Sequence, residues 1–425
     1  MMLAWAGVCG TIKFMQDIFA ILQERGFVKQ STDAEGLRRV LSASPITFYA
    51  GFDPTADSFH VGNLALIIAM SHLQRAGHRA IALLGGGTAM IGDPSGRTEA
   101  RPMMTEELIA ANSARLRAQL ERFLALDKER GMLLDNAAWL RDARYIDFLR
   151  EIGTHFRVNE MLKTETYRER IAREEGLSFL EFNYQLLQAY DYLQLFRTYQ
   201  CLLQIGGSDQ WGNMVAGVDL VRRKDQETVY VFTIPLLTTA DGKKMGKTES
   251  GAVWLDAAKT SPYEFYQYWI NTDDRDVERF LALFTFLPME RVRELGAFVG
   301  EKKREAKRTL AFEVTTLVHG GAEAKKVEEA ARAAFGKSGG DVSAVPTTTI
   351  SRARLEAGIS AAELFTEVGL AASKGAARRL VAQGGAYVND ERIDSPDTVI
   401  SASMLKDGAL MLRYGKKQYR RVAAE

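Results

Sequence analysis

The chain has 425 residues, which is too long for one compact domain, so two or three domains are expected. Its composition, 46% hydrophobic and 26% charged, is typical of a soluble globular protein, and its net charge of +1 excludes a uniformly basic nucleic-acid binder. The two cysteines, Cys9 and Cys201, lack metal-ligand spacing, so neither a disulfide framework nor a zinc site is expected.

The N-terminal segment is short and apolar. Met1 to Cys9 contains no basic residue, so it is a poor signal peptide and too short to span a bilayer. Met15 begins an amphipathic segment to Arg25, which predicts a helix, and residues 1–14 are expected to be an upstream-start extension or a tail. No other run approaches a membrane span, which favours a cytoplasmic location.

Short apolar runs alternate with longer amphipathic segments between residues 46 and 237. This alternation predicts an α/β fold with a doubly wound parallel sheet. The expected strands are Ile46–Ala50, Ala80–Leu84, Met132–Leu134, Cys201–Ile205 and Val229–Ile234. Ligands of such sheets bind at the carboxyl ends of the strands, so the glycine-rich segments that follow these runs are the candidate site.

The first of these segments runs from Gly51 to Asn63 and contains the sequence His60-Val61-Gly62-Asn63. A helix is expected from Val61 to Arg75. The start of a helix after a tight turn offers unpaired N–H groups and a positive dipole end, which favour an anion such as phosphate. A plain connection with a capping histidine is the alternative.

A second basic segment, from Asp241 to Thr248, contains Lys243, Lys244 and Lys247 beside two glycines. Lysines on a glycine-containing loop suit the charge that develops on a pyrophosphate leaving group, because positioning and electrostatics dominate such transfers. A solvated basic turn is the alternative.

Three further clusters could bind a small polar substrate. Tyr49 ends the first strand, and Asp93 lies in the loop Gly92–Arg97. Tyr184, Gln188 and Asp191 share one face of an expected helix, Phe179–Tyr199, through spacings of four and three. A half-buried helix with a polar edge is equally consistent with that spacing. The turn Gly206–Asn213 carries Asp209 and Gln210, although Ser208 and Asp209 could merely cap the next helix.

The last third of the chain reads as helices from about 261 to 335, then a glycine-rich linker, then a small module with two amphipathic helices, Ala361–Val368 and Ser373–Gln383. Its basic side chains suit a phosphate backbone, although an ordinary solvated helix is the rival interpretation. The candidate RNA-binding residues are Lys374, Arg378, Arg379, Lys416 and Lys417.

The histidine segment and the lysine loop resemble the HIGH and KMSKS signatures of class I aminoacyl-tRNA synthetases. Residues 49–58, 92–95, 183–191, 206–213 and 244–248 resemble the corresponding blocks of bacterial tyrosyl-tRNA synthetases, in the family order. The resemblance implies an N-terminal tail and helix (1–45), a Rossmann-like catalytic domain (46–255), a helical anticodon-side domain (256–335), a linker (336–347) and a C-terminal module (348–425) like that of a small-subunit ribosomal protein.

The resemblance also implies a role for each matching residue. Tyr49 and Asp191 would bind the tyrosine phenol, Asp93, Tyr184 and Gln188 the amino group, and Gln210 the carboxylate region. The ATP and adenylate residues would be Gly51, Asp53, His60, Gly62, Gly207, Asp209 and Lys247, and the catalytic residues Thr55, His60, Asn63, Lys244, Lys247 and Thr248. Arg97 and Arg101 match basic positions near pyrophosphate or the tRNA acceptor end. Two departures are Asn63, where the signature has histidine, and Gly246, where it has serine.

The expected function is therefore that of a tyrosine–tRNA ligase, with ATP as a substrate, Mg²⁺ carried on the ATP phosphates, and no metal held by the protein. The expected partners are L-tyrosine, ATP, tRNA(Tyr) and a second copy of the chain in a homodimer, without a membrane. A tryptophan-specific sister enzyme is disfavoured by Asp191 with Tyr49. An inactive RNA-binding scaffold is disfavoured by intact His60, Lys244 and Lys247.

Overall fold

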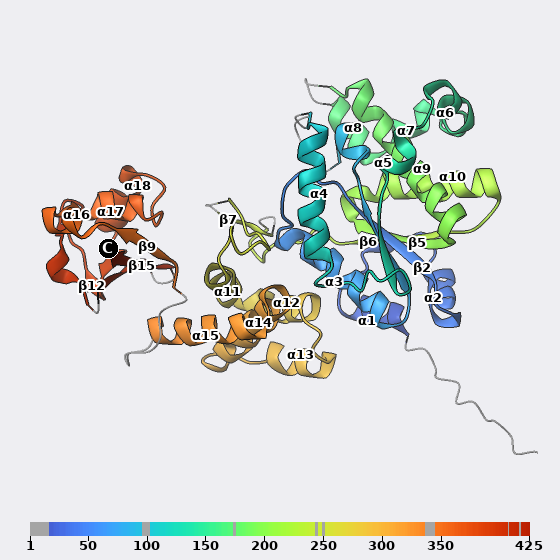
Figure 1. Ribbon diagram of the computed structural model, residues 1–425. Helices are drawn as coiled ribbons and strands as arrows, with labels where there is room; N and C mark the ends of the chain where they lie inside the picture. The colour runs from blue at the N-terminus through green and yellow to red at the C-terminus, as the bar shows by residue number, and fades with distance from the viewer. Residues whose placement is uncertain are drawn as a thin grey trace, which may run out of the picture. The chain divides into compact units, whose positions relative to one another are not determined.

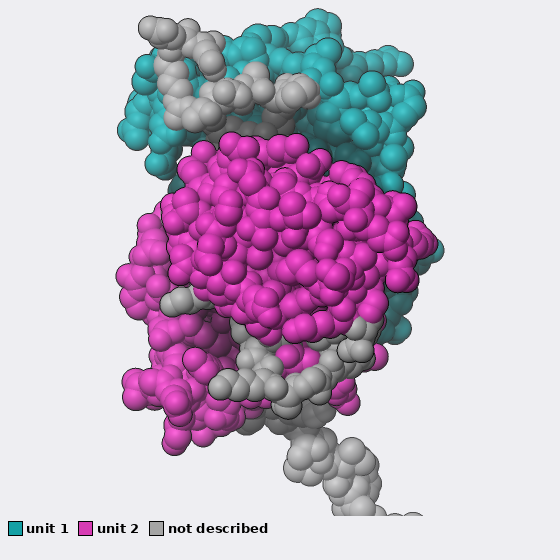
Figure 2. Space-filling model, turned by 90° about the vertical axis from the view of Figure 1, so that its left-hand side faces the viewer, with its two compact units in different colours: residues 1–57, 63–236 teal, residues 58–62, 237–425 magenta. Residues whose placement is uncertain are grey.

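The computed structural model describes residues 17–95, 103–172, 176–242, 245–248, 251–335, 345–406, 408–415 and 418–425, with only the backbone described at 247, 248, 334 and 335. The chain forms two compact units, residues 1–57 with 63–236 and residues 58–62 with 237–425 (Figure 2). Arg97, Arg101, Lys244, Lys416 and Lys417, the N-terminal fourteen residues and linker residues 336–344 lie outside the described residues. No helix in the described ranges is long and apolar enough to cross a membrane.

A six-stranded sheet with the order β1-β6-β5-β2-β3-β4 forms the centre of the first unit (Figure 1). Its strands are β1 (Gln30–Ser31), β2 (Thr47–Phe52), β3 (Arg79–Leu84), β4 (Gly131–Asp135), β5 (Cys201–Gly207) and β6 (Tyr230–Ile234). The strands β2 to β6 are parallel, whereas β1 pairs with β6 in the antiparallel sense. The five strands expected from the sequence are confirmed to within two residues, and the edge strand β1 was missed.

Helices cover both faces of this sheet, with α4 on one side and α9 and α10 on the other in Figure 1. The helices are α1 (Ile18–Glu24), α2 (Ala34–Ala43), α3 (Val61–Arg75), α4 (Glu106–Leu120), α5 (Ala137–Leu140), α6 (Tyr145–Glu151), α7 (Val158–Met161), α8 (Glu165–Ile171), α9 (Phe179–Tyr199) and α10 (Trp211–Asp225), with 3₁₀ turns η1 (Thr88–Met90), η2 (Gly153–His155) and η3 (Ser208–Gln210). The expected helices Val61–Arg75 and Phe179–Tyr199 are confirmed at both ends.

Local chemistry explains the bounds of α9. Ser178 and Glu181 form a capping box, in which each side chain accepts a hydrogen bond from the other residue's backbone N–H. Gln200 ends the helix in the left-handed conformation, with φ of 53°. The apolar face of α9 packs with α10 against the sheet, and Tyr49, Tyr192 and Leu193 are buried in the shared core. This packing fixes the polar residues of α9 relative to the strand ends.

The second unit contains a helical region and a small C-terminal module. The helical region comprises α11 (Pro262–Ile270), α12 (Val277–Phe284), α13 (Met289–Gly296), α14 (Lys302–His319), α15 (Gly321–Phe335) and η4 (Asp274–Asp276), preceded by the hairpin of β7 (Lys247–Thr248) and β8 (Gly251–Ala252). Trp269 of α11 is fully buried against Phe280 and Phe284 of α12. These aromatic contacts join the helices into one core.

The C-terminal module places helices on a five-stranded sheet with the order β12-β11-β14-β15-β9. Its elements are β9 (Thr347–Ile350), α16 (Arg352–Ala357), β10 (Ile359–Ser360), α17 (Ala361–Glu367), α18 (Lys374–Ala382), β11 (Ala386–Val388), β12 (Glu391–Arg392), β13 (Val399–Ile400), η5 (Ala402–Met404), β14 (Ala409–Tyr414) and β15 (Gln418–Ala424). Leu364, Phe365, Leu380 and Leu412 belong to its own apolar core. The two expected helices of this module are confirmed.

Candidate active site

The polar residues of the first unit that the sequence singled out lie in or after β2, after β3, after β5 and on α9. Tyr49 lies in β2 and is 1% exposed, and its ring meets Tyr192 edge-to-face at 5.2 Å between centroids. Its hydroxyl has no hydrogen-bond partner within the described part of the chain. Burial, followed by the nearby Asp191 charge, raises the pKa of Tyr49 well above its ordinary value. This phenol therefore stays protonated and can donate to a ligand.

Asp191 of α9 is 3% exposed and accepts two side-chain hydrogen bonds. Asn136 Nδ2 donates to one carboxylate oxygen at 2.9 Å, and Trp139 Nε1 donates to the other at 2.7 Å. Burial raises the pKa of Asp191 to about 7, against the lowering effect of these two donors. A buried carboxylate held in one orientation is suited to accept a hydrogen bond from a substrate hydroxyl.

Asp53 is a second carboxylate of the site, and two hydroxyl groups donate hydrogen bonds to it. Tyr184 Oη donates to Oδ2 at 2.8 Å, and Thr88 Oγ1 donates to Oδ1 at 2.8 Å. Asp53 and Tyr184 are 131 residues apart in sequence, so only the fold brings them together. The pair joins a residue expected to contact the amino group with one expected at the adenylate.

Asp93 is also buried, at 7% exposure, and its orientation is set by donors from Gln210 and Ser95. Gln210 Nε2 donates to Oδ2 at 2.7 Å, and the backbone N–H of Ser95 donates to Oδ1 at 2.9 Å. Burial raises the pKa of Asp93 to about 6, with the Asp53 charge also raising it. Asp53 likewise raises the pKa of Asp191, so three carboxylates influence one another electrostatically. A cationic amino group bound among them would be stabilised.

Two glycines after β3 allow these carboxylates to approach the backbone. A Cβ on Gly85 would lie 1.9 Å from Asp53 Oδ1, and a Cβ on Gly86 would lie 2.3 Å from Asp135 Oδ1. Either side chain would displace a carboxylate, so glycine is required at both positions by the close approach of that carboxylate.

Two other expected site segments are also placed by the structure. Gln188 is half-buried on α9. Ser208 and Asp209 do not cap α10, because its N-cap residue is Gln210, which makes no side-chain cap. The capped-turn alternative for that segment is wrong.

The signature histidine belongs to the second unit, which includes residues 58–62. The backbone N–H of Gly62 donates to His60 Nδ1 at 3.0 Å, so a neutral imidazole carries its proton on Nε2. His60 also pairs with Trp254 as an isolated β-bridge. Val61 N donates to Val253 O at 2.9 Å, and Leu255 N donates to Phe59 O at 2.8 Å. Backbone hydrogen bonds thus connect the histidine segment to residues 253–255, which directly follow β8.

That loop is described only in part. The backbone at Lys247 and Thr248 forms β7, and Gly246 adopts φ of +81°, a conformation that disfavours any other residue. Its backbone N–H donates to Tyr268 Oη at 3.3 Å, and its carbonyl accepts from Val253 N at 2.9 Å. Glycine at this position is therefore explained by backbone geometry.

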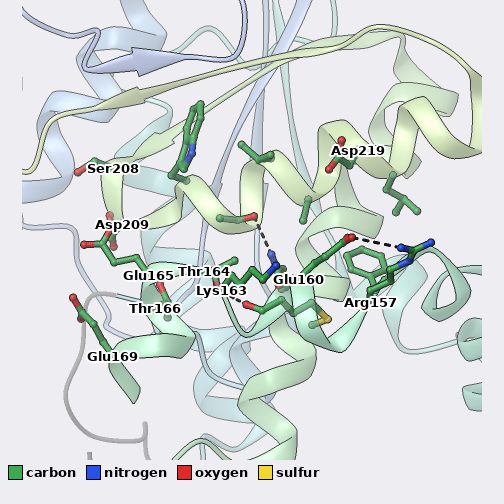
Figure 3. Close-up of a pocket in the computed structure, with 18 of the residues that line it drawn as sticks. Arg157, Glu160, Lys163, Thr164, Glu165, Thr166, Glu169, Ser208, Asp209 and Asp219 are labelled. Carbon is green, nitrogen blue, oxygen red and sulfur yellow. Dashed lines mark hydrogen bonds and ion pairs between the residues drawn. The ribbon is translucent and has the colours of Figure 1, made fainter. Parts of the chain in front are cut away.

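A cavity of about 730 Å³ lies beside the Asp209 segment in the first unit. Figure 3 shows Ser208 and Asp209 at one end and Arg157 and Asp219 at the other. Its walls come from α7, α8, α10 and η3, with cations and carboxylates interspersed. Tyr49 and Asp191 do not line it, so the cavity is distinct from the carboxylate cluster. No single sequence motif contains the walls of this cavity, so it could not be expected from the sequence.

Asn136, Trp139 and Thr88 hold Asp191 and Asp53, but none of the three was among the residues expected at the site. Asn136 directly follows β4, at the same sheet edge as the residues that were found. The rule that ligands bind at the carboxyl ends of strands would have pointed to it. Among the described residues no cluster of three or more His, Cys, Asp or Glu could hold a metal ion.

Comparisons with known proteins agree with this architecture. Residues 41–336 match the family described as tRNA synthetases class I (W and Y), and the chain belongs to that family of aminoacyl-tRNA synthetases. Residues 340–422 match the C-terminal domain described as tyrosine–tRNA ligase SYY-like. The matches over nearly the whole length place the chain in the tyrosine–tRNA ligase branch of this enzyme family.

Two relatives and one solved structure illustrate the similarity. Tyrosine–tRNA ligase of Clostridium tetani is 50% identical, covering 96% of this chain and 99% of its own. That of Desulfatibacillum aliphaticivorans is 52% identical, covering 96% and 98%. A C-terminally truncated mitochondrial tyrosyl-tRNA synthetase from Aspergillus nidulans has a TM-score of 0.67 at 33% identity, covering 75% of this chain and 94% of that chain.

Proposed function

We propose that this chain activates L-tyrosine with ATP and transfers the tyrosyl group to the terminal adenosine of tRNA(Tyr). The observation that carries the choice of amino acid is the pair formed by Asp191 and Tyr49. One is a buried carboxylate fixed by two N–H donors, and the other is a buried hydroxyl without a partner in the described residues. A phenol hydroxyl that donates to Asp191 and accepts from Tyr49 satisfies both groups. Phenylalanine leaves the Tyr49 hydroxyl without a partner and offers no donor to Asp191, which is costly.

The remaining side chains of the first unit suit the rest of the amino acid. Asp93, with Tyr184 and Gln188, binds the ammonium group, and Gln210 binds near the carboxylate. The tyrosine carboxylate attacks the α-phosphate of ATP, the bond to pyrophosphate breaks, and tyrosyl-adenylate forms. A ribose hydroxyl of the tRNA then attacks the acyl carbon and releases AMP. Alignment and electrostatic stabilisation supply the catalysis, without a covalent nucleophile from the protein.

The phosphate side is assigned to Thr55, His60, Asn63, Lys244, Lys247 and Thr248, and the adenylate to Gly51, Asp53, Gly62, Gly207 and Asp209. His60 suits this role because its Nε2–H can donate to a phosphate oxygen while Nδ1 is held by Gly62. Mg²⁺ accompanies ATP through the phosphate oxygens, as this ion usually does. These assignments rest on the family signatures together with the geometry of His60.

The decisive experiment is amino-acid-dependent ATP–pyrophosphate exchange with all twenty amino acids and no tRNA. We expect exchange with tyrosine alone. Exchange with tryptophan instead would show that the enzyme is specific for tryptophan. The absence of exchange in folded protein would favour an RNA-binding role without activation.

The C-terminal module is proposed to bind the tRNA backbone through α18. Lys374, Arg378 and Arg379 are exposed, while Ala377, Leu380 and Val381 of the same helix are buried. Among the described residues, Lys374 and Arg378 make long, exposed ion pairs of 3.8 and 3.7 Å, which cost little to replace with phosphate contacts. Alanine substitution of these three residues should weaken tRNA charging and its salt dependence, while tyrosine-dependent exchange without tRNA is retained.

We also infer a homodimer in the cytoplasm. Large apolar side chains are exposed between residues 145 and 180, including Tyr145 at 60%, Ile146 at 63%, Val158 at 55% and Phe179 at 69%. Large apolar side chains exposed to solvent favour a protein interface, and symmetric pairs are the commonest assembly. Sedimentation equilibrium of the wild type and of Phe179→Glu tests this, and a monomeric wild type at micromolar concentration would refute it.

A further inference from the structure

Two carboxylates of the first unit, that of buried Asp191 and that of half-buried Asp53, are connected by a continuous chain of side-chain hydrogen bonds. Asn136 is at its centre and is 1% exposed. Its Oδ1 accepts from the backbone N–H of Gly87 at 2.8 Å, which fixes the orientation of the amide. The two hydrogens of Nδ2 are then directed to Asp191 Oδ2 at 2.9 Å and to Thr88 Oγ1 at 3.0 Å. The amide of Asn136 is therefore fully engaged.

Thr88 continues the chain to the other carboxylate. It is 2% exposed, and because its oxygen accepts from Asn136, its single hydrogen is available for Asp53 Oδ1 at 2.8 Å. Thr88 thus needs its hydroxyl as donor and acceptor at once. Serine can reproduce both bonds, whereas valine, which has a similar shape, can reproduce neither.

Loss of the Thr88 hydroxyl would alter the position of Asp191, to which it is connected through Asn136. One N–H of Asn136 would be buried without a partner. Because an unsatisfied buried donor is unfavourable in free energy, the Asn136 amide would tend to reorient. Within the described residues, Asn136 Nδ2 donates to one carboxylate, that of Asp191, so reorientation of the amide would disturb the bond that holds this carboxylate. Asp53 would lose a donor at the same time, and its charge acts on Asp191.

We propose that Thr88 is a positioning residue for recognition of the substrate phenol, acting through Asn136 on the Asp191 carboxylate. This inference rests on the proposed role of Asp191 as the partner of the phenol hydroxyl. The same hydroxyl also donates to Asp53, which belongs to the amino and adenylate end, so a role at that end is the competing interpretation. The two roles differ in which substrates they affect.

The test compares exchange driven by tyrosine with exchange driven by phenylalanine in Thr88→Val, Thr88→Ser and wild type. We expect Thr88→Val to lower the ratio of kcat/KM for tyrosine over phenylalanine by about tenfold, because a hydrogen bond to a charged group is disturbed. The tyrosine KM should rise more than kcat falls. Thr88→Ser should restore the ratio to within about threefold of wild type, since one hydroxyl replaces the other.

Thr233→Val is the matched control. Thr233 lies in β6 of the same sheet, is 0% exposed, and its hydroxyl has no hydrogen-bond partner in the described residues. The same substitution there should leave the ratio unchanged. Both substrates are measured on one preparation, so any unfolded fraction cancels in the ratio.

An equal fall for both substrates in Thr88→Val would overturn the proposal and assign Thr88 to the amino end or to packing. An unchanged ratio would overturn it as well. Failure of the proposed function has a separate signature, because Asp191→Ala would then keep the selectivity of the wild type whatever Thr88 does.

Discussion

The ionisation of Asp191 should make the first unit less stable as the pH rises, and Asp191→Asn should remove that dependence. Burial raises the pKa of this carboxyl from 3.8 to about 7 in the folded chain. The folded state therefore binds the proton more tightly than the unfolded state between these two values. Stability contributed by the protonated carboxyl is complete below pH 3.8 and is lost progressively as the pH rises to 7.

The size of the effect follows from the slope of about 1.4 kcal/mol per pH unit for one proton. Between pH 5 and pH 7, which both lie inside the window, wild type should lose about 2–3 kcal/mol relative to Asp191→Asn. For a unit of this size each kcal/mol moves Tm by about 2–4 °C, so the difference in Tm between the two proteins should change by about 5–10 °C.

The assay is differential scanning calorimetry of both proteins at pH 5 and pH 7 without tyrosine, following the transition of the first unit. Asp93, whose pKa is raised to about 6, titrates in the same range, but it is present in both proteins and cancels in the comparison. Parallel pH dependences, with the Tm difference changing by less than about 2 °C, would refute the assignment of a raised pKa to this carboxyl.

Three further outcomes are expected. Arg170→Ala should destabilise the first unit by about 3–5 kcal/mol in calorimetry, because Glu181, 5% exposed, loses its two hydrogen bonds from Arg170 at 2.8 and 3.1 Å and stays charged. The control is Arg117→Ala, which removes an exposed ion pair, and similar Tm values for the two variants would contradict the prediction. Gly246→Ala should slow tyrosine-dependent exchange, since alanine is strained at φ of +81° and its Cβ would lie 3.1 Å from Gly62 N. Gly251→Ala is the control for backbone strain alone, because Gly251 has φ of +116° and open space where the Cβ would lie. Normal exchange in Gly246→Ala would count against a role for this turn. Lys247→Ala should reduce kcat for activation while the tyrosine dissociation constant from equilibrium dialysis stays within about twofold, because the loss falls on the transition state; a comparable loss of tyrosine binding would contradict the proposed phosphate role.

The parallel strands and the site helices α3 and α9 could be predicted because their signals are local. Apolar runs such as Ala80–Leu84 are bounded by glycines, and Ser178 with Glu181 marks the start of α9. The edge strand β1 could not be predicted, since Gln30 and Ser31 are polar and their strand conformation depends on pairing with β6. Here a tertiary contact, rather than propensity, decides the structure.

Site residues could be predicted from the sequence where they belong to family signatures. Their hydrogen-bond partners could not be predicted, because the folding of the sheet brings residues from distant parts of the sequence together. Asp53 meets Tyr184 across 131 residues, and Asn136 meets Asp191 across 55. Trp139, which also holds Asp191, lies in a four-residue helix without any recognisable motif. Such orienting contacts appear only when the carboxyl ends of neighbouring strands are seen together.

The attachment of residues 58–62 to the second unit has a practical consequence for the design of a minimal catalytic fragment. A truncation after residue 236 would retain these five residues but remove Val253 and Leu255, to which Val61 and Phe59 are hydrogen-bonded. The Ser58 hydroxyl, which accepts from Asp256 N at 3.2 Å, would lose that partner too. A fragment intended to keep His60 in place should therefore extend at least through Asp256, and a cleavage site for removing the C-terminal module belongs well downstream of it.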